Sequence, residues 1–280
     1  MIIYANGDSF VSGVELGDDI LSNHPGYLPY FADESLKESN RKWISKTYDT
    51  TTDNGQERIQ NQKAIMSLEY QRAFPNQLKS YLDCQVINHA QGGSSMNRII
   101  RTSMVDLMEL AKEDEPVIAL IGTTCPSRSE ISTPFNNLTD IDELGFTKTW
   151  EQISTTYKSS HQTGMLEKVI DYKIYHDKNY HQLVNAFLNI INLSNFCLLN
   201  RIKLFWICGY VDILNQVPIE TELANSKDYV QLRNNLNFSY TIDMNKIASG
   251  TNIENVLCPS GHFSPEIHHI IAKRLGQVLS

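Results

Sequence analysis

Four apolar runs in this chain lack the alternation of polar and apolar residues that marks a half-exposed strand. They cover residues 1–6, 84–90, 115–123 and 202–210 and read MIIYAN, CQVINHA, EPVIALIGT and IKLFWICGY. Continuous apolar runs of this length are typical of strands that are buried on both faces, as in parallel sheets. Helical patterns lie between them, over 63–82, 95–114 and 179–200. The sequence therefore predicts an α/β fold, a three-layer α/β/α sandwich with a parallel sheet and right-handed crossovers.

The helical segments also indicate where they begin and which side they bury. Ser264 and Pro265 are a suitable N-cap and first residue for a final helix. We expect Pro75 to split or restart the helix over 63–82. The stripe expected on the final helix is Ile267, Ile270, Ile271, Leu275 and Val278, and the face expected over 95–114 is Ile99, Met104, Leu107, Met108 and Leu110.

Three polar stretches fit this alternation poorly: residues 17–62, 130–178 and 211–250. Each is too polar to hold a core alone, so we expect a single domain over 1–280 with these stretches as insertions over the carboxyl edge of the sheet. Long loops on such a scaffold often shape binding sites. The insertions are therefore expected to decide which substrate enters.

Composition excludes several classes of protein. A net charge of −8 and a pI near 5.5 are wrong for a nucleic-acid binder, which needs a basic surface. The start lacks the pattern of a signal peptide, and the run IKLFWICGYV has about half of the roughly 20 residues of a membrane span. Five cysteines without a CxxC pair favour packed thiols in a reducing compartment. We expect a cytoplasmic protein without membrane partner or cofactor.

Small polar clusters follow the predicted strands, where the carboxyl ends of a parallel sheet form its binding crevice. The clusters comprise Gly7, Asp8 and Ser9 after the first strand; Asn88, Gly92, Gly93 and Ser95 after the second; Gly122, Thr123, Thr124 and Arg128 after the third; and His262 before the last helix. A serine, a glycine-rich turn, a hydroxyl and a histidine on one rim can supply a nucleophile, oxyanion donors and a base. The rim therefore favours acyl-transfer chemistry.

Each cluster alone has a plainer interpretation. Gly, Asp and Ser are ordinary turn formers, a glycine pair with serines is often a tight turn or helix cap, and a histidine before a helix is often a surface residue. A metal site is a weaker alternative, because His176 and His181, or His268 and His269, lack a third ligand at a recognisable spacing. Cys125 and Cys258 flank the rim, where packing explains them better than reactivity.

The order of these clusters resembles the SGNH (GDSL-type) hydrolases. NGDSFVSG, residues 6–13, is similar to the family's first block, and the resemblance implies that Ser9 is the nucleophile. VINHAQGGSS, residues 86–95, is similar to the second block and implies Gly93 as an oxyanion donor, with Asn88 and Ala90 at its other pattern positions. The resemblance implies the flavodoxin-like sheet of the SGNH hydrolase fold.

The last block of the family is similar to GHFSPEIHHIIAKRL, residues 261–275. The resemblance implies His262 as the base and places a second histidine of the block at His268. Residues 121–128, IGTTCPSR, are similar to a branch of the family found in tailed-phage genomes, which implies the host cytoplasm as location if the chain is viral. In that branch pattern Arg128 anchors its loop or binds an anionic substrate group.

Two positions depart from the family pattern. Thr124 stands where the third block usually has an asparagine that donates to the oxyanion, and a threonine hydroxyl can donate one hydrogen bond there. Pro259 and Ser260 stand where an acid would orient His262, and the loss of that acid costs orders of magnitude in rate unless it is replaced. Asp212 and Glu254 are candidate replacements, as is a backbone carbonyl.

We therefore expect a serine esterase that cleaves an O-acetyl or other acyl group from a carbohydrate or small metabolite. Ser9 forms the acyl-enzyme, His262 is the base, and the backbone N–H groups of Ser9 and Gly93 hold the oxyanion with the Thr124 hydroxyl. Asp8 shapes the turn, and Asn88 is a candidate orienting residue. Two alternatives stay open: a catalytically decayed member that binds a glycan or protein, and an acyltransferase that uses the same serine. The sequence does not indicate an oligomeric state.

Overall fold

The computed structural model describes residues 1–13, 16, 67–92, 94–125, 128–132, 150–154, 179–209, 224–236, 240–253, 256–258 and 262–280. Within 128–132, 150–154 and 179–181 it describes the backbone alone. The four predicted strands are confirmed as β1 (Ile2–Asn6), β2 (Gln85–Asn88), β3 (Val117–Thr123) and β6 (Lys203–Cys208). A fifth strand, β7 (Thr241–Asp243), completes the sheet.

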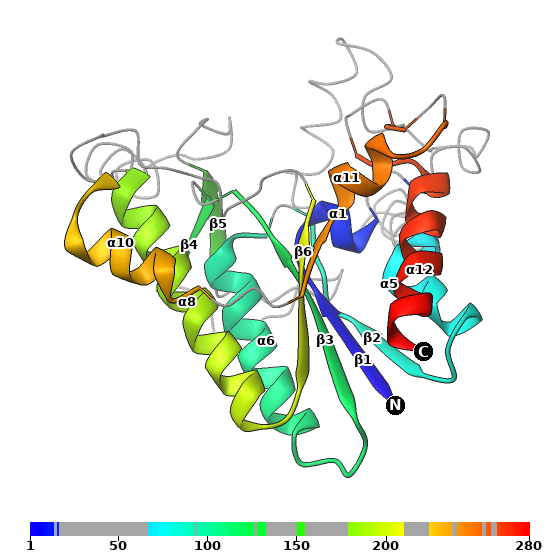
Figure 1. Ribbon diagram of the computed structural model, residues 1–280, viewed down its shortest axis with the longest axis horizontal. Helices are drawn as coiled ribbons and strands as arrows, with labels where there is room; N and C mark the ends of the chain where they lie inside the picture. Colours follow the sequence, from blue (N-terminus) through cyan, green and yellow to red (C-terminus); the bar gives the residue numbers. More distant parts are fainter. Residues whose placement is uncertain are drawn as a thin grey trace, which may run out of the picture.

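All five strands run parallel, in the order β2-β1-β3-β6-β7 (Figure 1). Counted along the chain this is 2-1-3-4-5, the flavodoxin-like order, in which the strand sequence reverses between the first and third strands. Ala5 is opposite both Asn88 and Leu120, so the ends of β1, β2 and β3 lie level at the carboxyl edge. The predicted α/β class with a flavodoxin-like parallel sheet is confirmed.

Helices cover both faces of the sheet, because successive side chains of a strand point to opposite sides. Ile2 and Tyr4 of β1 pack in the core that contains α6 (Met96–Leu110) and α8 (Asn179–Leu199), with α10 (Lys227–Asn234) outside. Ile3 and Ala5 pack in the opposite core with α5 (Phe74–Gln77), α11 (Met244–Ser249) and α12 (Pro265–Leu279) (Figure 1). The two layers give the predicted sandwich.

The helix boundaries follow the sequence closely, with corrections to their faces. Pro75 lies in the first turn of α5, and Pro265 begins α12 as predicted. The buried face of α6 is Met96, Ile99, Ile100, Ser103 and Leu107, so the expected placement of Met108 was wrong: it is 51% exposed. Val278 of α12 is likewise 63% exposed, so its expected place on the buried stripe was wrong.

Two segments that were expected to be insertions contain regular structure. β7 and α11 lie within 211–250 and belong to the sheet and its covering layer. β4 (Arg128–Ser132) and β5 (Trp150–Ser154) form a separate antiparallel pair beside α6. The third expected insertion, 17–62, lies outside the described residues.

One described helix is long and apolar enough to cross a membrane by length and composition: Gln182–Leu199 in α8. In the structure this helix contributes Leu183, Phe187 and Ile190 to the core. A core helix of this kind passes the same test of length and composition as a membrane span.

Candidate active site

Ser9 lies at the point where the strand order reverses, directly after β1 (Figure 1). It begins the short helix α1 (Ser9–Ser12), whose N-cap Asp8 accepts a hydrogen bond from the Phe10 N–H at 3.1 Å. Gly13 ends the helix in the left-handed region, with φ 80°, and its N–H donates to the Ser9 carbonyl. Asp8 thus holds the turn that presents Ser9, the role predicted for it.

Glycines at three strand ends make room for α1. A Cβ on Gly7 or on Gly122 would lie 2.6 Å from Val11 Cγ2, and each would lie 3.1 Å from the other glycine's Cα. A Cβ on Gly209 would lie 2.8 Å from Phe10 Cβ. Glycine at the ends of β1, β3 and β6 therefore allows Phe10 and Val11 to pack directly against the sheet. This close packing fixes the position of Ser9.

The loop after β2 is tied to the same turn. The Gln91 N–H donates to the Gly7 carbonyl at 3.0 Å, so the β1–β2 pairing continues past the strands. Asn88 Oδ1 accepts from the Ala90 N–H at 3.1 Å, while its buried Nδ2 has no partner among the described residues. Asn88 therefore shapes the loop that leads to Gly93. Gly93 itself lies outside the described residues.

Thr124 follows β3 at the same edge and is 2% exposed. Its predecessor Thr123 donates through its hydroxyl to the Ile207 carbonyl at 3.4 Å, so it is used to join β3 to β6. Thr124 is the residue that follows β3 at this edge of the sheet. It occupies the strand end that the sequence predicted for the third oxyanion donor.

His262 is brought to α1 by a closed loop. The Leu257–Phe263 bridge and the hydrogen bond from the Cys258 N–H to the His262 carbonyl, at 2.7 Å, form that loop just before α12. The His262 ring packs on the Phe10 ring, with 5.1 Å between ring centroids. The Phe263 ring also packs on Phe10, with 5.5 Å between centroids. The predicted base therefore lies against the residue next to Ser9. No hydrogen bond joins the Ser9 hydroxyl to another described residue.

His268, the second histidine of the last block, is buried and structural. Its Nδ1 accepts a hydrogen bond from the Phe74 N–H at 3.1 Å, which assigns the ring proton to Nε2 and joins α12 to α5. Burial, together with the nearby His262, lowers the pKa of His268 to about 3. His268 is therefore neutral at physiological pH and anchors the helix that follows His262.

Several predicted residues lie outside the described part of the chain. They are Pro259, Ser260, Asp212 and Glu254, together with the Arg128 side chain, whose backbone belongs to β4. The group that orients His262 therefore stays a prediction. The described residues contain no cluster of three metal-ligating side chains, and His176 and the His181 side chain lie beyond them.

A buried polar network supports the end of β1, and the sequence analysis missed it. Asn6 Oδ1 accepts from the Gly7 N–H at 2.8 Å, and Asn6 Nδ2 donates to the Tyr4 and Ser103 hydroxyls at 3.1 and 3.0 Å. The Tyr4 hydroxyl donates to Asp106 Oδ2 at 2.7 Å, and His89 Nδ1 lies 2.8 Å from the same oxygen. The network runs from the half-exposed His89 to the turn before Ser9.

Polar residues on the inner side of α6 were the available signal for this network. Thr102 and Ser103 lie four and three residues before Asp106 among the apolar positions of the helix, and these spacings bring each of them to the side of Asp106. Burial raises the pKa of Asp106, but hydrogen bonds from His89 and Tyr4 lower it by more. The hydrogen bond to Asp106 raises the pKa of His89, against burial and the nearby Arg98.

No family model and no curated protein sequence matches this chain. A candidate lipolytic protein of the G-D-S-L family from Desulfitobacterium hafniense aligns over 99% of this chain and 98% of its own, at 11% identity and a TM-score of 0.42. The psychrotrophic esterase EstA from Pseudoalteromonas sp. aligns over 99% of this chain and 98% of its own, at 10% identity and a TM-score of 0.42. A catalytic mutant of the acetylxylan esterase Axe2 from Geobacillus stearothermophilus aligns over 99% of this chain and 92% of its own, at 11% identity and a TM-score of 0.37. Alignments at these values carry no argument about activity or substrate.

The buried His268 predicts a loss of stability in acid. Its folded pKa of about 3 lies below the ordinary value of 6.5, so the unfolded state binds the extra proton between these values. This contribution to stability is complete above pH 6.5 and falls by up to about 1.4 kcal/mol per pH unit below it. In urea unfolding between pH 6.5 and 4.5, the free energy of unfolding of His268→Gln should depend less steeply on pH than that of the wild type. The exposed neighbour offers the control, since His269→Gln should keep the slope; an unchanged slope in His268→Gln would contradict the assignment.

The His89–Asp106 pair predicts the opposite dependence. Because the pKa of His89 is raised, its contribution is complete below pH 6.5 and is lost as pH rises through the folded pKa. Asp106→Asn should therefore lower the free energy of unfolding by about 1–2 kcal/mol at pH 5.5 and by less at pH 8.5. Urea unfolding at both values measures this. Asp114→Asn, at an exposed carboxylate, should be neutral at both, and equal losses for Asp106→Asn would count against the pair.

Proposed function

We propose that this chain is a serine esterase of the SGNH type, which cleaves an ester bond through a Ser9 acyl-enzyme with His262 as base. One observation carries the proposal: Ser9 begins a short helix at the sheet's reversal point, and the His262 ring packs on Phe10 beside it. Ser9 and His262 are about 250 positions apart in the sequence, and the packing of His262 on the neighbour of Ser9 supports the pairing. A turn with no chemical role has no need of this pairing.

The chemistry follows from the positions of these groups. His262 accepts the proton as Ser9 Oγ bonds to the ester carbonyl carbon, and the oxyanion accepts hydrogen bonds from the N–H of Ser9, the N–H of Gly93 and the Thr124 hydroxyl. The first N–H groups of a helix have no partner within it, so the N–H of Ser9 is suited to this role. His262 returns the proton to the leaving alcohol, and water then releases the acid and restores Ser9.

The substrate we propose is an acyl ester of a carbohydrate or small metabolite. Each oxyanion donor lowers the barrier by roughly 3 kcal/mol. In this proposal the Thr124 hydroxyl takes the place of an asparagine amide, so the number of donors to the oxyanion stays at three. If the acyl group passes to a sugar or nucleotide hydroxyl rather than to water, the same Ser9 serves. Product analysis with an added acceptor separates transfer from hydrolysis.

A fluorophosphonate probe tests the nucleophile directly. It should label the wild-type chain and the Ser12→Ala variant, and it should fail to label Ser9→Ala. Ser12 is the matched control, because it is a buried serine of the same helix. Labelling of Ser9→Ala at the wild-type level would reject Ser9 as the nucleophile.

The binding-protein alternative has one structural observation in its favour. The Ser9 hydroxyl has no hydrogen bond to a described residue, and an activated nucleophile is expected to bond to its base. A wild-type chain that is inert to the probe and binds a glycan or protein saturably would establish this alternative.

A further inference from the structure

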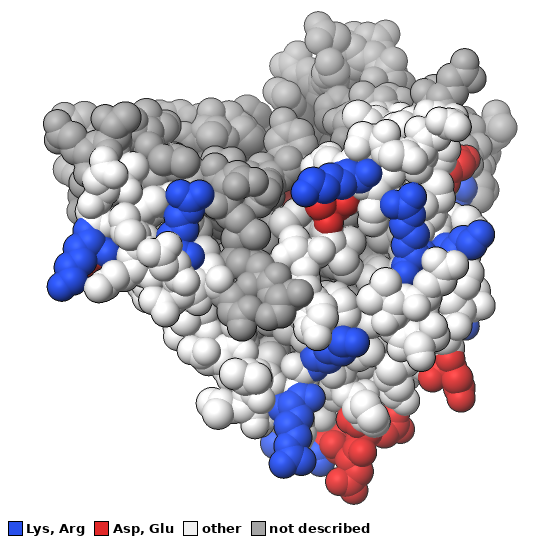
Figure 2. Space-filling view, viewed as in Figure 1, with Lys and Arg blue, Asp and Glu red and all other residues white. Residues whose placement is uncertain are grey.

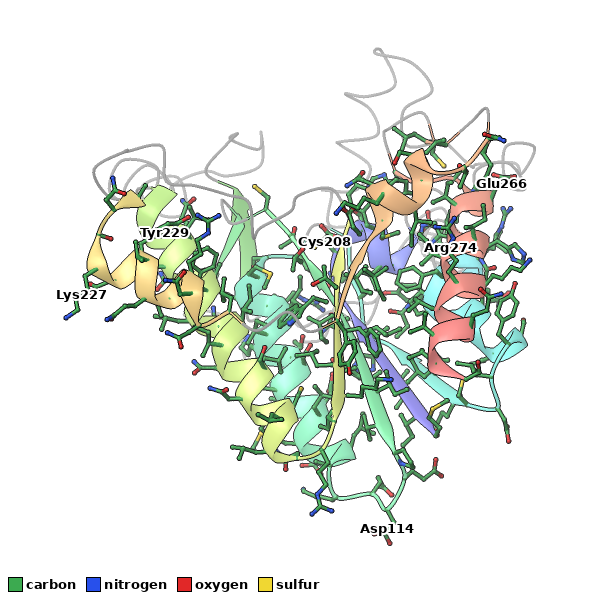
Figure 3. All side chains as sticks on the ribbon, viewed as in Figure 1. Asp114, Cys208, Lys227, Tyr229, Glu266 and Arg274 are labelled. Carbon is green, nitrogen blue, oxygen red and sulfur yellow. The ribbon has the colours of Figure 1, made fainter. Side chains whose placement is uncertain are left out.

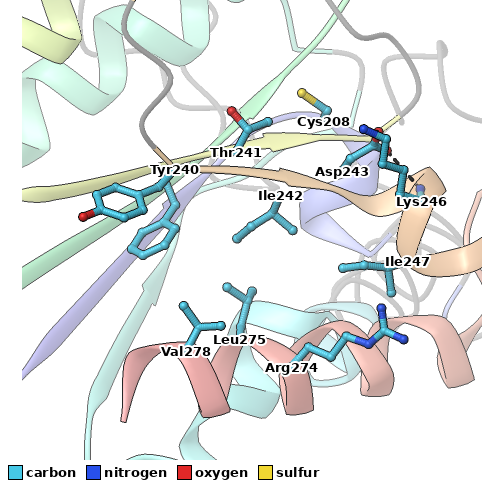
Figure 4. Close-up of a pocket in the computed structure, with 11 residues that line it drawn as sticks. Cys208, Tyr240, Thr241, Ile242, Asp243, Lys246, Ile247, Arg274, Leu275 and Val278 are labelled. Atoms are coloured by element: carbon cyan, nitrogen blue, oxygen red, sulfur yellow. Dashed lines mark hydrogen bonds and ion pairs between the residues drawn. The ribbon is translucent and has the colours of Figure 1, made fainter. Parts of the chain in front are cut away.

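A groove of about 610 Å³ lies on the edge of the molecule away from the serine turn (Figure 4). It is bounded by β6, by the edge strand β7, and by α11 and the last turns of α12. Its wall is mostly aliphatic and aromatic, from Phe205, Ile242, Ile247, Leu275 and Val278. Its volume is in the range of small-molecule sites. Neither Ser9 nor His262 lines it.

Apolar side chains are exposed to water at one end of this groove. Tyr240, just before β7, is 50% exposed, and Val278 of α12 is 63% exposed. Exposed apolar surface costs roughly 25 cal/mol per Å², so a ligand that covers this end gains that free energy. The groove is therefore suited to the hydrocarbon part of a ligand.

Cationic side chains occupy the other end. Arg274 lies on the α12 side of this end and Lys246 on the α11 side, with Ile247 between them in the view and the Lys246 amine directed toward Asp243 (Figure 4). Lys246 Nζ is 3.8 Å from Asp243 Oδ2, at the limit of an ion pair, and Arg274 has no ion pair with a described residue. Figure 3 labels Arg274 at α12, and Figure 2 shows Lys and Arg side chains on the α11–α12 side as well as elsewhere on this face. This end of the groove therefore has two cationic side chains and one carboxylate, that of Asp243, although the chain as a whole has a net charge of −8.

The two ends are separated by about one helical turn. Arg274 and Val278 are four residues apart on α12, which is about 6 Å along the axis. A ligand that reaches from the cations to the exposed apolar end therefore carries an anionic head on a short linear chain. A guanidinium binds a carboxylate through two parallel hydrogen bonds, which makes a carboxylate the head group that fits best.

We propose that this groove binds a medium-chain carboxylate. The carboxylate contacts Arg274, and the alkyl chain lies over Ile242 and Leu275 toward Tyr240 and Val278. The site is separate from the serine turn, so the proposal holds whether or not Ser9 is a nucleophile.

Isothermal titration with octanoate at low ionic strength tests this proposal. The wild type and Ser9→Ala should bind one equivalent with the same affinity, and Arg274→Gln should bind on the order of tenfold more weakly. Lys273→Gln is the matched control, because Lys273 is the exposed neighbour of Arg274 on α12 and does not line the groove. Its affinity should stay within about twofold of the wild type, since screened surface charges contribute little.

A second pair of measurements separates a specific site from general apolar adsorption. Val278→Glu places a carboxylate beside the chain end at an exposed position that the fold tolerates, and it should weaken octanoate binding by about fivefold. Octylammonium has the same chain with a cationic head and should show no saturable binding. Equal affinity for octanoate and octylammonium, equal affinity in Arg274→Gln and Lys273→Gln, or no octanoate binding by the wild type would overturn the proposal.

Discussion

In a Ser9→Ala variant we expect kcat/KM for p-nitrophenyl butyrate to fall by roughly 10³-fold or more, and His262→Ala should show a loss of similar size. The double variant should lose almost nothing beyond Ser9→Ala alone. The reason is that His262 acts on the Ser9 proton, so the imidazole has no task once the hydroxyl is gone. The packing of His262 on Phe10, with 5.1 Å between ring centroids, is the contact that makes this coupling possible.

Two control variants separate lost chemistry from lost structure. Ser12→Ala changes a serine of the same helix, and His269→Gln changes an exposed histidine of α12. Both should keep kcat/KM within about threefold, and all variants should keep the wild-type unfolding midpoint within a few degrees. Losses that multiply in the double variant would show that Ser9 and His262 act independently. Equal rates in the wild type and both single variants would remove the proposed mechanism altogether.

The sequence was sufficient for the strands that are buried on both faces and for the helices between them. Apolar runs without alternation at β1, β3 and β6 leave no other fold class. β7 could not be found in this way, because its three residues are too few to form a pattern. Its place in the sheet is decided by pairing with β6, which no local feature of Thr241–Asp243 encodes.

The candidate site was predictable where short motifs carry it and hidden where distant residues meet. Ser9 and His262 each lie in a short polar motif, and the flavodoxin-like order brings the end of β1 and the start of α12 to the same edge of the sheet. The contact between His89 and Asp106 depends on the relative placement of β2 and α6, which periodicity does not specify. The positions of Pro75 and Pro265 in first helical turns were predicted correctly, because proline acts on the local backbone. The burial of Val278 was predicted wrongly, because helix periodicity does not say which part of a helix face its neighbours cover.

The glycine contacts under α1 give the second large effect. We expect Gly122→Ala to lower the free energy of unfolding by about 3 kcal/mol, at the upper end for overpacking, because the new Cβ meets Val11 Cγ2 at 2.6 Å and the Gly7 backbone at 3.1 Å. The substitution should also lower the proposed esterase activity, since α1 must move away from the sheet and carries Ser9 with it. Urea unfolding followed by circular dichroism measures the first effect, and the p-nitrophenyl butyrate assay measures the second.

A double-mutant cycle tests whether Val11 is the residue that forbids the larger side chain. Val11→Ala alone should cost about 1–2 kcal/mol through lost burial, and it removes the atom that the new Cβ meets first. The double variant should therefore be more stable than the sum of the two losses by at least about 1 kcal/mol. Gly250→Ala is the matched control, because an added Cβ there meets only carbonyl oxygens at 3.3 and 3.7 Å. Additive losses at Gly122 and Val11 would mean that α1 does not rest on the strand ends as described.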